Sequence, residues 1–127
     1  MAGPLQGVVV VAVEDEPDAL AMLQIMMEHE GALVIPAPDA NSALETLHRV
    51  RPTVLVTDLS MPSRAGGWLV AEARRWGLLA DVPTLVVTAI TMTPHEVQEA
   101  GFDAYLRKPV DPTALCETVR ALAQRAA

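Results

Sequence analysis

The sequence predicts a single α/β domain built on a doubly wound, five-stranded parallel sheet with helices on both faces. Apolar, β-branched runs of strand length alternate five times with segments of helix length. The runs are continuously apolar, which is typical of strands that are covered on both faces, and the connections between them are short. The 127 residues suffice for one domain, whose core we place at about residues 8–124.

The first half of the chain contains two strand–helix pairs. Gly7–Val13 is a valine-rich run, which indicates a buried strand. Pro17 suits the first turn of the following helix, where its missing N–H costs nothing. We expect a second strand at residues 32–37, near an edge of the sheet, because Pro36 cannot donate to a neighbouring strand. A second helix at residues 40–50 completes this half.

The second half contains three more pairs. We predict strands at residues 53–57, 83–89 and 104–109, and helices at residues 68–76, 94–100 and 112–124. Asp111 and Pro112 form a strong helix start, since aspartate caps the first turn and proline fits its first position. No repeat or linker interrupts the alternation. The predicted arrangement is that of a flavodoxin-like domain.

Composition excludes several classes of protein. The net charge of −7 argues against a surface that binds nucleic acid, because a phosphate backbone requires a basic patch. No apolar run is long enough to span a membrane, and residues 1–7 lack the features of a secretory signal. The single cysteine, Cys116, fits a reducing compartment, and we expect it half-buried on a helix. We therefore expect a cytoplasmic chain that contacts no membrane and does not itself bind nucleic acid.

Polar side chains stand where the predicted strands end. The first strand is followed by Glu14 and Asp15, the third by Asp58, and the fourth and fifth end at Thr88 and Lys108. The carboxyl ends of parallel strands meet at one edge of the sheet, so these side chains should converge on one crevice. Three carboxylates that lie together need a cation, and oxygen ligands suit Mg²⁺ better than zinc. The histidines that zinc would prefer fall on predicted helices: His29, His48 and His95.

This set of residues is suited to receive a phosphoryl group. A carboxylate beside Mg²⁺, a lysine and a hydroxyl can accept a phosphoryl group while the cations neutralise charge on the phosphoryl oxygens. Each residue alone has a simpler explanation. Strand-end acids commonly cap the next turn or helix, Lys108 before proline can be merely solvated, and Thr88 suits a strand. Their coincidence on one predicted edge favours a shared site.

At these positions the sequence resembles the receiver domain of bacterial two-component response regulators. The matching stretches occur in the family's order and span about residues 8–124. They are Val13–Asp18, Val56–Pro62 with Gly66, Val86–Ala89, and Ala100–Gly101 followed by Tyr105–Pro109. The resemblance implies a signalling domain, and not an enzyme beyond its own phosphorylation and dephosphorylation.

The resemblance also implies which residues take part in phosphorylation. Asp58 would become a phosphoaspartate by accepting the phosphoryl group of a phosphohistidine. The donor would be a sensor histidine kinase or a phosphotransfer protein. Mg²⁺ would be held by Asp58 together with Glu14, Asp15 and the backbone carbonyl of Ser60.

Three further residues would respond to the phosphoryl group. Lys108 would contact it, and Thr88 would move to hydrogen-bond it. Tyr105 would then change rotamer and alter the face made by the fourth helix, fifth strand and fifth helix. A downstream protein target would recognise that face.

Three features depart from the family's usual pattern. Glu14 stands where aspartate is more common, and its longer arm would reach the metal through water. Arg64 places a cation in the loop after the acceptor, where we expect it to be solvated; contact with a phosphoryl oxygen or a partner is the alternative. The segment between Thr88 and Lys108 is shorter than usual, so we expect a short or displaced fourth helix.

Two other functions stay open on the sequence. A pseudo-receiver would signal by protein contact without phosphorylation; the altered fourth-helix region permits this, but the intact Asp58, Thr88 and Lys108 disfavour it. A phosphohydrolase with an aspartyl nucleophile would need a cap or second domain to enclose its substrate, and the sequence has no segment left to build one.

Overall fold

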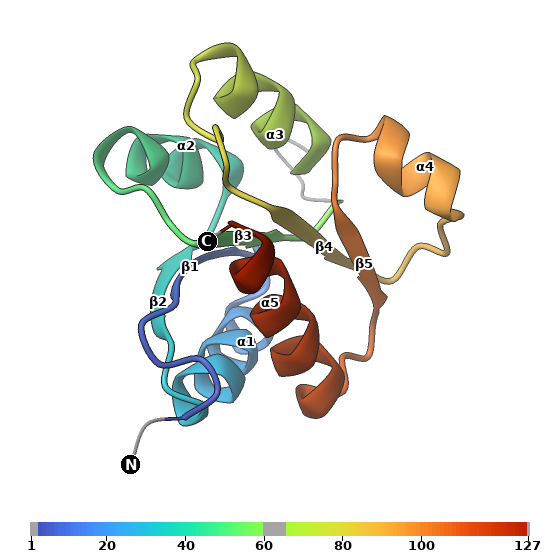
Figure 1. Cartoon of the computed structure of the whole chain (residues 1–127). Helices are drawn as coiled ribbons and strands as arrows, with labels where there is room; N and C mark the ends of the chain where they lie inside the picture. The colour runs from blue at the N-terminus through green and yellow to red at the C-terminus, as the bar shows by residue number, and fades with distance from the viewer. Residues whose placement is uncertain (1–2, 60–65, 127) are drawn as a thin grey trace.

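The computed structural model describes residues 3–59 and 66–126 of the chain. Parallel strands form one sheet in the order β2-β1-β3-β4-β5, and helices cover it (Figure 1). The strands are β1 (Val9–Val13), β2 (Leu33–Ala37), β3 (Val54–Thr57), β4 (Thr84–Thr88) and β5 (Ala104–Arg107). The helices are α1 (Pro17–His29), α2 (Ala40–Arg49), α3 (Gly66–Arg75), α4 (Pro94–Glu99) and α5 (Pro112–Ala126). This confirms the predicted α/β fold and its alternation of strands and helices.

Helices cover both faces of the sheet, which explains the continuously apolar strands. α1 and α5 pack on one face, while α2, α3 and α4 lie on the other side (Figure 1). β3 and β4 are buried throughout, and β1 nearly so. Each face has its own core, with Leu55 and Leu69 in one and Leu85 and Leu115 in the other. Among the described residues, no helix is long and apolar enough to cross a membrane.

The strand order places β1 and β3 side by side within the sheet, so their carboxyl ends lie together. The chain moves outward from β1 to β2, then returns past β1 to β3, β4 and β5. Connections therefore diverge between β1 and β3, which is the position where sheets of this kind bind ligands beyond the carboxyl ends of their strands. Val13 is level with Thr57, and the N–H of Asp58 donates to the Val13 carbonyl at 3.1 Å. The next residues along each strand, Glu14 and Asp58, are thereby brought together.

β2 forms an edge of the sheet, as its proline predicted. The N–H of Leu33 donates to Val8 at 2.9 Å, and the carbonyl of Ala37 accepts from Glu14 at 3.2 Å. Alternate residues of a strand face its neighbour, so the nitrogen of Pro36 faces away from β1. The proline therefore costs the sheet no hydrogen bond.

Two helix boundaries bear on the prediction. α3 begins at Gly66, two residues before the predicted start at Trp68. A pattern of apolar side chains gives no signal at glycine, so it misses the first two residues of the helix, Gly66 and Gly67. α4 has six residues, Pro94–Glu99, which confirms a short fourth helix. Its start is well defined, because Thr93 and Glu96 form a reciprocal capping box.

Candidate functional site

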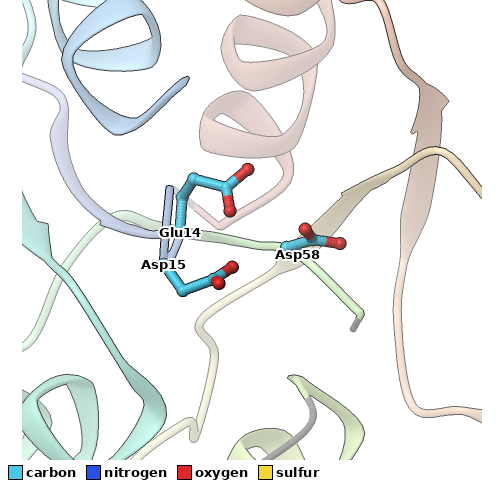
Figure 2. Close-up of side chains that lie close together, drawn as sticks. All are labelled: Glu14, Asp15 and Asp58. Carbon is cyan, nitrogen blue, oxygen red and sulfur yellow. The ribbon is translucent and has the colours of Figure 1, made fainter. Parts of the chain in front are cut away.

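Glu14, Asp15 and Asp58 lie together where β1 and β3 end (Figure 2). Each offers one carboxylate oxygen, and these oxygens all lie within 4.8 Å of one another. Figure 2 shows the side chains of Glu14 and Asp15 leaving the turn after β1 in different directions. Asp15 is exposed, whereas Glu14 and Asp58 are buried. The sequence expectation that three acids meet at this edge agrees with their positions.

Lys108 reaches the same acids from the residue that follows β5. Its Nζ atom donates hydrogen bonds to Oε1 of Glu14 and, at 3.0 Å, to Oδ2 of Asp58. Its backbone N–H donates to the carbonyl of Thr88 at 2.9 Å, which fixes the base of the side chain beside β4. The exposed fractions of the side chains are 28% for Lys108, 11% for Asp58 and 2% for Glu14. Solvent therefore screens these ion pairs less than it screens pairs on a protein surface.

Burial determines the electrostatics of the site. It raises the pKa of Glu14, because the charged carboxylate loses solvent, and the hydrogen bond from Lys108 offsets only part of this effect. Burial alone would lower the pKa of Lys108, but hydrogen bonds to Glu14 and Asp58 outweigh it and hold that pKa above its usual value. The lysine is therefore a permanent cation of the site at neutral pH.

The carboxylate cluster fits a hard divalent cation. Its donors are oxygens alone, and the exposed Asp15 leaves room for the waters that Mg²⁺ retains. The histidines lie elsewhere, on α1, α2 and α4 as expected: His29, His48 and His95. Ser60, expected to offer its carbonyl to the metal, and Arg64 in the same loop lie outside the described residues.

Thr88 and Tyr105 are connected through the backbone of Ile90. Oγ1 of the buried Thr88 accepts the N–H of Ile90 at 3.3 Å. The hydroxyl of Tyr105 donates to the carbonyl of Ile90 at 2.8 Å. Ile90 thus joins the two residues that the resemblance expects to act in succession. The sequence did not single out Ile90, because the connection uses only its backbone groups.

The sequence also gave no indication of the ion pair between Glu14 and Lys108. It placed both residues at the correct edge but assigned Glu14 to the metal alone. The direction of a side chain beyond a strand end depends on the geometry of the following turn, which an apolar pattern does not specify.

Comparison with known sequences reveals relatives of this chain. A family model described as the response regulator receiver domain matches residues 10–120. An uncharacterized 14.6 kDa protein of Leptolyngbya boryana is 36% identical over 113 residues, which cover 87% of this chain and 86% of that protein. The phosphate regulon transcriptional regulatory protein PhoB of Escherichia coli K12 is 27% identical over 118 residues, which cover 91% of this chain and 52% of PhoB. The chain thus spans about half the length of that regulator.

Solved structures that resemble this chain include a protein of similar length. The chemotaxis protein CheY4 of Vibrio cholerae is 27% identical, with a TM-score of 0.84. The similarity covers 91% of this chain and 98% of the CheY4 chain. The sheet and the helices around it are therefore shared over nearly the full length of both proteins.

Proposed function

Because this chain belongs to the family of response regulator receiver domains, we propose that Asp58 is its phosphoryl acceptor. The donor in this proposal is a phosphohistidine of a sensor histidine kinase or a phosphotransfer protein. One observation carries the proposal: Asp58 directly follows a central strand, with Lys108 Nζ 3.0 Å from its carboxylate and two further carboxylates beside it. A charged acceptor, a fixed cation and a metal-binding cluster are what transfer to an aspartate requires.

In the proposed reaction a carboxylate oxygen of Asp58 attacks the phosphorus of the phosphohistidine. The new P–O bond forms as the P–N bond breaks, and the electron pair of the P–N bond passes to the imidazole nitrogen. Negative charge accumulates on the phosphoryl oxygens during transfer, and the ammonium group of Lys108 lies close enough to Asp58 to neutralise part of it.

Asp15 and Asp58 are the proposed carboxylate ligands of Mg²⁺, with Glu14 contributing charge or reaching the metal through water. The backbone carbonyl of Ser60 completes the proposed ligand set, although that residue lies outside the described part of the chain. When bound, Mg²⁺ would neutralise the repulsion among the three acids and charge on the phosphoryl group.

The proposed output begins at Thr88. Its oxygen already accepts the Ile90 N–H, so its hydroxyl proton is available to a phosphoryl oxygen. Movement of Thr88 toward that oxygen would disturb Ile90 and hence the hydrogen bond from Tyr105. A phosphoryl group makes contacts that the unphosphorylated carboxylate lacks, and such differential contacts can shift a two-state equilibrium. A downstream protein target would recognise the altered surface around α4 and β5.

Intact-mass spectrometry tests the proposal. The protein is incubated with a small phosphodonor such as acetyl phosphate, with and without Mg²⁺, in parallel with Asp58→Asn. We expect one phosphoryl adduct that requires Mg²⁺, is labile in base and is absent from the variant. No adduct on the unmodified protein under any condition would favour the pseudo-receiver. Sustained release of phosphate from a phosphomonoester would favour the phosphohydrolase.

A further inference from the structure

We infer that Glu14 is the positioning residue for Lys108, and that holding this lysine, rather than ligating the metal, is its main contribution at the phosphorylation site. The inference deepens the proposed function and rests on it. Lys108 is the only lysine in the chain, so no other lysine side chain can replace it.

The contacts of Glu14 are directed into the protein. Its Oε1 atom accepts a hydrogen bond from Lys108, and its Oε2 atom accepts the backbone N–H of Glu16 at 3.4 Å. Only 2% of the side chain is exposed. The next residue, Asp15, is exposed and leaves the turn in another direction (Figure 2). Of the two neighbouring acids, Asp15 is therefore the one open to a hydrated cation.

The surroundings of this pair are apolar on one side. Glu14 and Lys108 border a groove between α1 and the end of β5, whose walls include Leu23, Met26 and Val87. A carboxylate buried beside such groups needs an opposite charge and a hydrogen bond, and Lys108 supplies both. The pair is thus a fixed feature of the site, present before any phosphoryl group arrives.

The contact of Lys108 with both Glu14 and Asp58 affects Asp58 as the phosphoryl acceptor. Nζ contacts both Glu14 and Asp58, so Asp58 does not receive the whole of its charge. If Glu14 were neutral, Lys108 would pair with Asp58 alone and would reduce its nucleophilicity. After transfer, Asp58 has lost its carboxylate charge by forming an acyl phosphate, whereas Glu14 keeps its own and continues to hold the lysine beside the phosphoryl group.

The first test observes the lysine directly. Protein labelled with ¹³C,¹⁵N-lysine has a single lysine side-chain signal set in NMR spectra, because Lys108 is the only lysine. We expect Glu14→Gln and Glu14→Asp to shift the Nζ and Cε resonances in the absence of Mg²⁺ and phosphodonor. Asp15→Asn removes the same charge from the adjacent residue and is the matched control; it should shift them far less. Equal shifts in Asp15→Asn and the Glu14 variants, or none in the latter, would overturn the inference.

The second test separates positioning from metal binding. Phosphorylation by acetyl phosphate is followed over a Mg²⁺ titration in the same variants. We expect phosphorylation of Glu14→Gln to be slower by about tenfold at saturating Mg²⁺, the effect of replacing the charged partner of Lys108 by a neutral amide, which is a weaker acceptor. Asp15→Asn should instead recover as Mg²⁺ is raised, because its defect is in affinity. Recovery of Glu14→Gln to the original rate at high Mg²⁺ would show that Glu14 is a metal ligand and would overturn the inference.

Two controls keep these results interpretable. Backbone amide spectra establish that each variant is folded, and Glu14→Asp, which keeps the charge but shortens the arm, serves if Glu14→Gln does not fold. If the unmodified protein is not phosphorylated at all, the proposed function fails. The lysine spectra would still show whether Glu14 holds Lys108, so the two failures are distinguishable.

Discussion

Lys108 compensates the charge of Glu14, whose carboxylate is almost entirely buried. Replacement by methionine keeps much of the side-chain volume but leaves that carboxylate without an ionic partner. We expect Lys108→Met to lower the free energy of unfolding at pH 7 by about 2 kcal/mol, the cost of a buried acceptor that loses its donor. Urea denaturation followed by circular dichroism measures the change.

Two further variants isolate this effect of the ion pair. Arg107→Met removes a cation at the preceding, exposed position and should change stability little. Adding Glu14→Gln to Lys108→Met should recover part of the loss, because no buried charge is then unpaired. A double variant less stable than Lys108→Met alone would contradict this account.

At the scale of secondary-structure elements, the start of α2 shows how one carboxylate contributes to a helix. Asp39 is the N-cap, and its Oδ1 atom accepts the N–H of Ser42 at 2.7 Å. This hydrogen bond lowers the pKa of Asp39. Because the pKa is lowered in the folded state, the ionised cap contributes to the free energy of unfolding at pH values above the unfolded pKa of 3.8. This contribution is lost as the pH falls through the folded pKa.

We therefore expect the effect of Asp39→Ala to depend on pH. At pH 7 it should lower the free energy of unfolding by about 1 kcal/mol, the typical value of an N-cap. The difference from the original protein should narrow below the folded pKa of Asp39, where the protonated carboxyl is a weaker acceptor. Urea unfolding at a series of pH values measures the difference in free energy of unfolding between the two proteins. A difference that grows as the pH falls would refute the role of Asp39 as an ionised N-cap.

The connection between β4 and α4 is held by hydrogen bonds from its two neighbouring strands. Tyr105→Phe removes the hydroxyl that donates to the Ile90 carbonyl and changes little else. We expect faster amide hydrogen exchange in residues 89–93, with little change in α4, because its Thr93–Glu96 capping box is intact. Exchange followed by mass spectrometry measures this. Equal acceleration throughout α4 would mean that Tyr105 stabilises the helix and not only the connection.

The sequence predicts well those elements whose apolar pattern or proline determines where they lie in the fold. The continuous apolar runs of β1, β3 and β4 required cover on both faces, and Pro36 required an edge; both were confirmed. Leu115, Val119 and Leu122 face the core because they recur at helical spacing. The half-buried Cys116 on α5 also agrees with expectation.

The sequence could not predict two kinds of contact: hydrogen bonds made by main-chain groups, and contacts that depend on the direction of a side chain. The link through Ile90 uses main-chain groups, which every residue has. The pairing of Glu14 with Lys108 joins residues 94 positions apart and depends on side-chain direction at a turn. The convergence of Glu14, Asp15, Asp58 and Lys108 was therefore predictable from the strand ends, whereas their hydrogen-bond partners required coordinates.

At the scale of the whole molecule, the proposed metal site at Glu14, Asp15 and Asp58 would couple Mg²⁺ binding to stability. Three carboxylates within 4.8 Å repel one another in the folded chain and separate when it unfolds. A cation that binds only the folded state stabilises it, by about 2.7 kcal/mol at a hundred times its Kd. We expect Mg²⁺ to raise the Tm and excess EDTA to reverse the rise.

Differential scanning fluorimetry or calorimetry measures the effect of Mg²⁺. NaCl at matched ionic strength controls for general screening, and Asp15→Asn should lose most of the Mg²⁺-dependent rise. A rise of the same size in NaCl, or an undiminished rise in Asp15→Asn, would argue against a specific site at this cluster.

The outward-facing nitrogen of Pro36 has a consequence for the behaviour of the protein in concentrated solution. An edge strand with a full row of free N–H and C=O groups can pair with the same strand of another molecule and so begin aggregation. On β2, Leu33 is 60% exposed and would favour such an encounter. Pro36 removes a donor from the row that an incoming strand would need, and its ring hinders close approach. The chain can therefore keep the apolar central strands that position its carboxylate cluster, while the β2 edge resists intermolecular sheet growth.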